Sequence, residues 1–121
     1  MSYDQVVFPF AAAWNLVVAA MLLTRPSKML ARMGITDPAA CLLARSFVSS
    51  VATWGLAYAM IAIDPTRFRD FAWLGAISKS LYFTINTPPF IRGRLSRQAF
   101  LPAILDLLLA ALFLEFLWRT H

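Results

Sequence analysis

Four long apolar segments alternate with short polar connections along the chain. They cover approximately residues 6–23, 38–63, 68–86 and 98–118. A bilayer core about 30 Å thick is crossed by roughly 20 helical residues, and about 17 can suffice. All four segments reach that length, the third only just. Because the connections are short, neighbouring helices should be antiparallel. The pattern predicts an all-α integral membrane four-helix bundle forming one domain over residues 1–121.

Local signals mark where these helices should begin and end. Asp37 is a good N-cap and Pro38 a good first helical residue, and Ser96 is a plausible cap for the last helix. The third segment should stop at the sequence NTPP, residues 86–89, because proline interrupts a helix.

Composition supports a lipid environment. Hydrophobic residues make up 60% of the chain and charged residues 14%, against about 25% in an ordinary soluble domain. The net charge of +5 does not indicate nucleic-acid binding, since the basic residues cluster in loops between apolar runs. Cys41 and His121 are the only residues of their kinds, which argues against a disulfide, a metal site or a haem. We expect no cofactor.

Loop charges predict the orientation. The first and third connections carry six basic residues, Arg25, Lys28, Arg32, Arg92, Arg94 and Arg97. The opposite side carries three, Arg67, Arg69 and Arg119. Basic loops favour the cytoplasm, so both termini should lie outside a bacterial inner membrane. The start, MSYDQVVF, lacks the basic region of a cleaved signal peptide, so the first segment should be a retained helix.

One polar residue in each segment lies at a similar depth. Counted from the basic end of its helix, each is eight or nine residues in, or roughly 12–14 Å: Asn15, Arg45, Lys79 and Asp106. A charged residue near the bilayer centre costs about 2.5–3.5 kcal/mol on insertion scales. We therefore expect the four side chains to converge inside the bundle. Two cations against one carboxylate would leave a surplus of +1, which a bound anion or lipid headgroup could neutralise.

A structural interpretation stays open beside this one. Arg45 and Asp106 could form an ion pair that only fixes helix register, while Lys79 extends toward the cytoplasm. Further polar residues favour a site: Ser49 follows Arg45 at i+4, and Tyr82 and Asn86 follow Lys79 at i+3 and i+7. Glu115 lies on another face, and its expected partner is Arg119.

Three sequence segments carry a resemblance. LLARSF in the second helix, ISKSLYF in the third and ILDLLLAALF in the fourth look like a family of small bacterial four-helix membrane proteins. In layout the chain is similar to DoxX-like proteins, although the Arg and Lys typical of their first helix are missing. The resemblance implies the four-helix fold. It implies little about activity, because the functions of such proteins are diverse.

Two functional hypotheses follow from the residues. In the first, Asn15, Arg45, Lys79 and Asp106 bind an amphipathic anion or a lipid headgroup. That protein would be a non-enzymatic membrane component, and a homo-oligomer or a larger membrane complex stays open. In the second, the protein is a small enzyme acting on a lipid-like substrate, with Asp106 or Lys79 as general acid or base.

Overall fold

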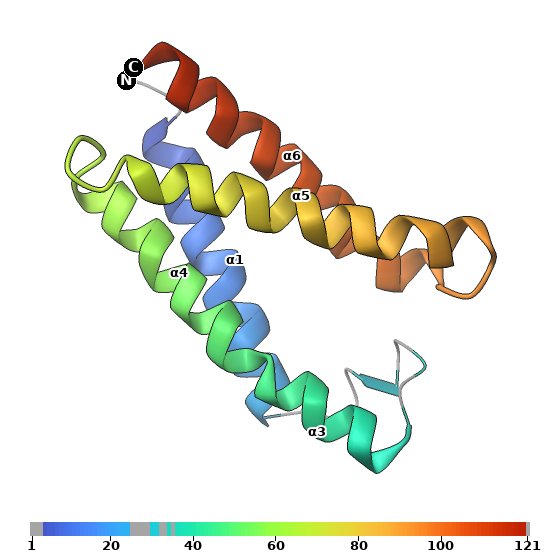
Figure 1. The fold of residues 1–121 in the computed structure, drawn as a ribbon. Helices are drawn as coiled ribbons and strands as arrows, with labels where there is room; N and C mark the ends of the chain where they lie inside the picture. Colours follow the sequence, from blue (N-terminus) through green and yellow to red (C-terminus); the bar gives the residue numbers. More distant parts are fainter. Residues whose placement is uncertain (1–3, 25–29, 32–33, 35, 121) are drawn as a thin grey trace.

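The computed structural model describes residues 4–24, 30–31, 34 and 36–120, and in these residues all regular structure is helical (Figure 1). The helices are α1 (Asp4–Thr24), α3 (Pro38–Ser46), α4 (Val48–Ile63), α5 (Asp70–Ile91) and α6 (Arg97–Arg119). Since α3 and α4 form one interrupted helix, Pro38–Ile63, the described chain contains the four expected helices. Three of them, α1, α3–α4 and α6, are long and apolar enough to cross a membrane. The all-α fold is confirmed.

The predicted caps are present. The Asp37 carboxylate accepts a hydrogen bond from the backbone N–H of Ala40, and the Ser96 hydroxyl accepts one from Ala99. Each satisfies a backbone donor that the first turn of a helix leaves without a partner. The three basic residues of the first connection, Arg25, Lys28 and Arg32, lie outside the described residues.

The predicted end of the third helix is wrong. α5 begins at Asp70 and continues through Pro88 and Pro89 to Ile91, rather than ending at residue 86. Two contacts stabilise the turn beyond the prolines: the Arg92 N–H bonds to the Pro88 carbonyl, and Phe90 stacks on Phe100 of α6 with ring centroids 4.2 Å apart. Tertiary packing therefore extends a helix that local sequence signals would end.

A short interruption at Phe47 separates α3 from α4. The N–H of Phe47 still bonds to the Leu43 carbonyl, so the helical path continues. Beside it, the Ser46 hydroxyl bonds to the Leu42 carbonyl and the Ser49 hydroxyl to the Ser46 carbonyl. Hydroxyl groups that bond back to the helix in this way commonly bend it.

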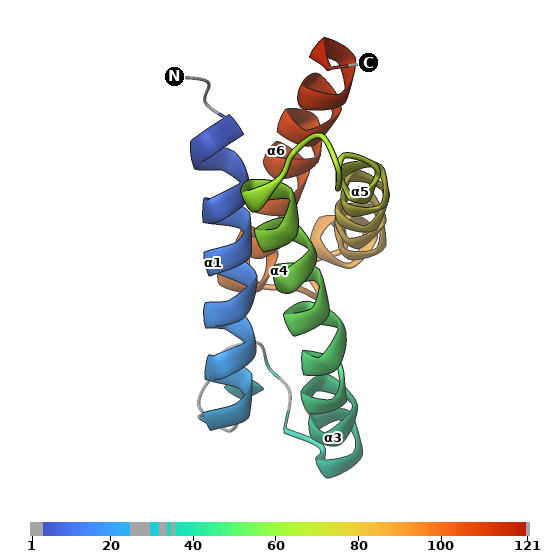
Figure 2. The ribbon, with the colours of Figure 1, turned by 90° about the vertical axis from the view of Figure 1, so that its left-hand side faces the viewer.

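The helices form two antiparallel hairpins. α1 packs along α4, and α5 packs along α6, whereas contacts between the hairpins are sparse. The hairpins meet near the end that carries both termini and the α4–α5 connection, and they diverge toward the other end (Figures 1 and 2). The basic α5–α6 connection and α3 thus lie at the ends of two separated arms.

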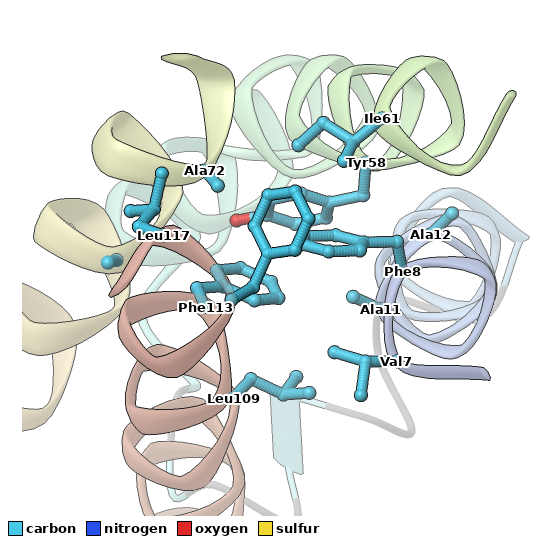
Figure 3. Packing of buried hydrophobic residues seen from close by; sticks show 12 residues of the cluster. Val7, Phe8, Ala11, Ala12, Tyr58, Ile61, Ala72, Leu109, Phe113 and Leu117 are labelled. Carbon is cyan, nitrogen blue, oxygen red and sulfur yellow. The ribbon is translucent and has the colours of Figure 1, made fainter. Parts of the chain in front are cut away.

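An aromatic cluster fills the region where the hairpins meet (Figure 3). Phe8 of α1 stacks on Phe113 of α6 at 5.0 Å between ring centroids, and Tyr58 of α4 lies 5.1 Å from Phe113. All three side chains are buried. We call this region the junction. A second, smaller cluster lies within the first hairpin and contains Ala19, Leu22, Leu30 and Val48.

Ion pairs join the chain ends at the same side as the junction. Arg119 pairs with Glu115, as expected from the sequence, and also with Asp4 of α1 at 2.6 Å. Arg69 donates hydrogen bonds to the Leu117 carbonyl and the Thr120 hydroxyl. These contacts fasten the start of α1 and the start of α5 to the end of α6.

Candidate functional site

Lys79 and Asp106 form an ion pair between α5 and α6. Lys79 Nζ lies 3.0 Å from Asp106 Oδ1, and the two side chains are 5% and 16% exposed. The surrounding residues are small: Gly75 and Ala76 on α5 and Ala103 and Ala110 on α6 are buried. Small residues let the two helices pack closely. Their short side chains also leave room for the lysine side chain to lie between the helices.

Tyr58 brings a third helix to this pair. Lys79 Nζ lies 5.2 Å from the centroid of the Tyr58 ring, within the range of a cation–π interaction. The approach depends on Gly75, where an added Cβ would lie 2.8 Å from Tyr58 Cε1 and 3.2 Å from its hydroxyl oxygen. In Figure 3 the Tyr58 hydroxyl points from α4 toward α5. The site therefore joins both hairpins at the junction.

The three polar groups of the site have hydrogen-bonding capacity that the described chain does not use. Lys79 carries three N–H donors, and one of them is bonded, to Asp106 Oδ1. Within the described residues neither Asp106 Oδ2 nor the Tyr58 hydroxyl has a hydrogen-bond partner. Neither atom is fully buried, although Tyr58 as a whole is only 1% exposed. The three polar groups thus lie close together at the junction, and each keeps some hydrogen-bonding capacity.

Arg45 does not belong to this site, so the predicted convergence of the four residues is wrong. Its side chain is exposed, and in the described part of the chain Asp106 pairs with Lys79 instead. The reason is helical geometry, because Arg45 and Tyr58 lie about 140° apart around the helix axis. Ser49 is exposed as well, and its hydroxyl bonds to the Ser46 carbonyl of its own helix.

The predicted surplus of +1 disappears with Arg45. One ammonium and one carboxylate remain at the junction, and their formal charges cancel. The site therefore needs no anion for neutrality.

Asn15 is buried, as expected, but it serves a different contact. Its Nδ2 donates to the Val51 carbonyl at 3.1 Å, which links α1 to α4 inside the first hairpin. Gly55 lies against it, since a Cβ there would be 3.2 Å from Asn15 Cβ. Asn15 thus stabilises helix packing one turn away from Tyr58 and does not bond to the ion pair.

Replacing Asn15 by Ala should cost about 0.5–1.5 kcal/mol of stability, the usual contribution of one intramolecular hydrogen bond. The Val51 carbonyl keeps its place in the helix, so no large rearrangement is expected. Unfolding of the detergent-solubilised variant, followed by helix content, measures the change. A loss of stability well above this range would mean that Asn15 stabilises more than the contact between α1 and α4.

Tyr82 and Asn86 continue the α5 face that carries Lys79, and both are partly buried. Asp106 is within electrostatic range of Tyr82 as well as Tyr58. The Asn86 side chain bonds to the Tyr82 carbonyl. Of the two residues, Tyr82 is the nearer to Lys79 along α5.

Sequence reasoning did not assign Tyr58 to the cluster. A signal was available: Tyr58 lies in an apolar helix among small residues such as Gly55, Ala57 and Ala59. A tyrosine buried between helices usually needs a partner for its hydroxyl. Tyr58 lies close to the predicted stripe of Arg45, Ser49 and Thr53, but its contact is with the Lys79 ammonium instead.

Neither a protein family, nor a curated protein, nor a solved structure matches this chain. The function must therefore be argued from the site alone.

Proposed function

We propose that the protein is a small multi-pass membrane protein that binds an amphipathic molecule by its polar head at the junction. The observation that carries this proposal is the unused hydrogen-bonding capacity of Lys79, Asp106 and Tyr58, which lie together between α4, α5 and α6. Polar groups in such surroundings cost free energy unless they are bonded. A bound head group would satisfy them.

The divergence of the hairpins supports an elongated ligand. From the site, the Tyr58 face of α4 continues toward Phe47 and Leu43 of α3, which are exposed. The α5 face continues through Tyr82 toward Asn86. A ligand whose head group lies at the junction could therefore place its apolar chain along the exposed Phe47 and Leu43 side chains.

The proposal includes an orientation in a bacterial inner membrane. Arg92, Arg94 and Arg97 are exposed in the α5–α6 connection, at the end away from the junction and both termini. With basic loops in the cytoplasm, the arms open toward the cytoplasm and the termini lie outside. α5 would be the least apolar of the four spans, because it carries several polar residues, among them Lys79, Ser80 and Asn86.

Catalysis is the alternative that the sequence left open. The ion pair favours binding over catalysis, since each charge already has its counter-charge and neither group is a free base. A chemically altered ligand released from the purified protein would support the catalytic alternative instead.

Native mass spectrometry of protein extracted in mild detergent tests the binding proposal. Lys79→Gln and Arg45→Gln each remove one positive charge, but only the first changes the site. We expect a lipid-like adduct on the wild type and on Arg45→Gln, and at least a tenfold lower bound fraction on Lys79→Gln.

Loss of binding must be separated from loss of fold. The double variant Lys79→Gln with Asp106→Asn removes both charges and leaves no unpaired ion, so it should retain helix content. It should still lack the adduct. An adduct that persists on this double variant, or that disappears only with Arg45→Gln, would contradict the proposal.

A further inference from the structure

We infer that the head group bound at the junction is uncharged and carries a free hydroxyl, as in a diacylglycerol or a long-chain alcohol. This inference rests on the proposed function and specifies its ligand. It follows from the charge balance of the site, from its depth along the helices and from the kinds of hydrogen-bonding groups that remain unused.

The charge balance disfavours an anionic head. Lys79 and Asp106 already neutralise each other at 3.0 Å. A phosphate or carboxylate beside them would give the site a net negative charge, of −1 or larger in magnitude, in surroundings of low dielectric. Uncompensated charge in such surroundings is costly, whereas a neutral head leaves the pair balanced.

Depth gives an independent reason. Lys79 lies nine residues after the start of α5 and twelve before its end, and Asp106 has a similar place in α6. At 1.5 Å per residue, both lie roughly 13–20 Å from either end of their helices. A charged head would have to leave the membrane surface to reach them, at a cost of several kcal/mol. A hydroxyl head has no charge to desolvate.

The unused groups match a hydroxyl. Lys79 offers N–H donors, Asp106 Oδ2 is an acceptor, and the Tyr58 hydroxyl can do either. One ligand hydroxyl can donate to Oδ2 while accepting from Lys79 or Tyr58. An ester or ether oxygen can only accept, and it would leave Oδ2 without a partner.

Three short-chain probes test the head group by native mass spectrometry titration. They are 1,2-dioctanoylglycerol, its 3-acetyl ester, which lacks the hydroxyl, and dioctanoyl phosphatidic acid. The free glycerol should bind at least tenfold more tightly than either of the others. On the Lys79→Gln, Asp106→Asn double variant this preference should disappear.

Tyr58→Phe removes one hydroxyl and keeps the ring that packs on Phe113. It should weaken binding of dioctanoylglycerol about three- to tenfold, as expected for one hydrogen bond, and leave the acetyl ester unchanged. An equal effect on both probes would show that Tyr58 only shapes the junction and does not bond to the ligand.

The possible results distinguish failure of the head-group inference from failure of the proposed function. If phosphatidic acid binds most tightly and its binding needs Lys79, the head-group inference is overturned and the proposed function stands. Equal binding of the free glycerol and its ester also overturns the inference. If the double variant binds every probe and the lipid adduct as well as the wild type does, both the head-group inference and the proposed function are wrong.

Discussion

Asp106→Asn should destabilise the protein by about 3–5 kcal/mol, the range typical when one partner of a buried ion pair is removed. The amide leaves the Lys79 ammonium, 5% exposed, without its counter-charge. Reversible unfolding by a denaturing detergent in mixed micelles, followed by circular dichroism, gives the change in the free energy of unfolding.

A second substitution identifies the true partner of Asp106. Lys79→Gln should restore most of the stability lost in Asp106→Asn, because the double variant contains no unpaired charge. Arg45→Gln, which also removes one cation, should restore none. Simple additivity of Lys79→Gln and Asp106→Asn would show that the two residues are not coupled. Rescue by Arg45→Gln would instead support the pairing that the sequence suggested.

Gly75→Ala should cost about 1–3 kcal/mol, the usual penalty for overfilling a packed interior. The new methyl group would lie 2.8 Å from Tyr58 Cε1 and 3.2 Å from Phe113 Cε2, so an aromatic ring must shift. This penalty opposes the roughly 0.8–1.0 kcal/mol that alanine gains over glycine in a helix. The same unfolding assay measures the net effect.

Gly55→Ala is the matched control for Gly75→Ala. Its Cβ would meet Leu16 Cγ at 3.0 Å, and a leucine side chain can adjust more easily than a buried ring. The loss should therefore be smaller. Adding Tyr58→Leu to Gly75→Ala should recover part of the lost stability, because the clashing ring is gone. No recovery would mean that Gly75 matters for α5 itself rather than for its approach to Tyr58.

Much of the fold could be predicted because it depends on local and compositional signals. Three of the four apolar segments, the Asp37 and Ser96 caps and the Glu115–Arg119 pair appear as expected. The end of α5 could not be predicted locally. Phe90, in its last turn, stacks on Phe100 of α6, and this contact with the next helix cannot be read from local sequence signals.

The site was predicted in part. The cost of burying charge indicated that Lys79 and Asp106 should lie near each other, and they form an ion pair. The same reasoning included Arg45, although depth along a helix says nothing about the direction of a side chain around it. Deciding that direction requires knowing which face of α4 meets α5. Tyr58 and Ile61 define that face, and they became apparent only from their burial.

The sparse contact between the hairpins has a consequence for how the protein unfolds. Each hairpin holds itself together through its own helix–helix packing, so cooperativity between the two halves must pass through the aromatic cluster and the ion pair of Arg119 with Asp4. Weakening these few contacts between the hairpins would make the two hairpins unfold in separate transitions. A single sharp unfolding transition therefore indicates that the contacts between the hairpins are intact, and two transitions indicate that they are lost.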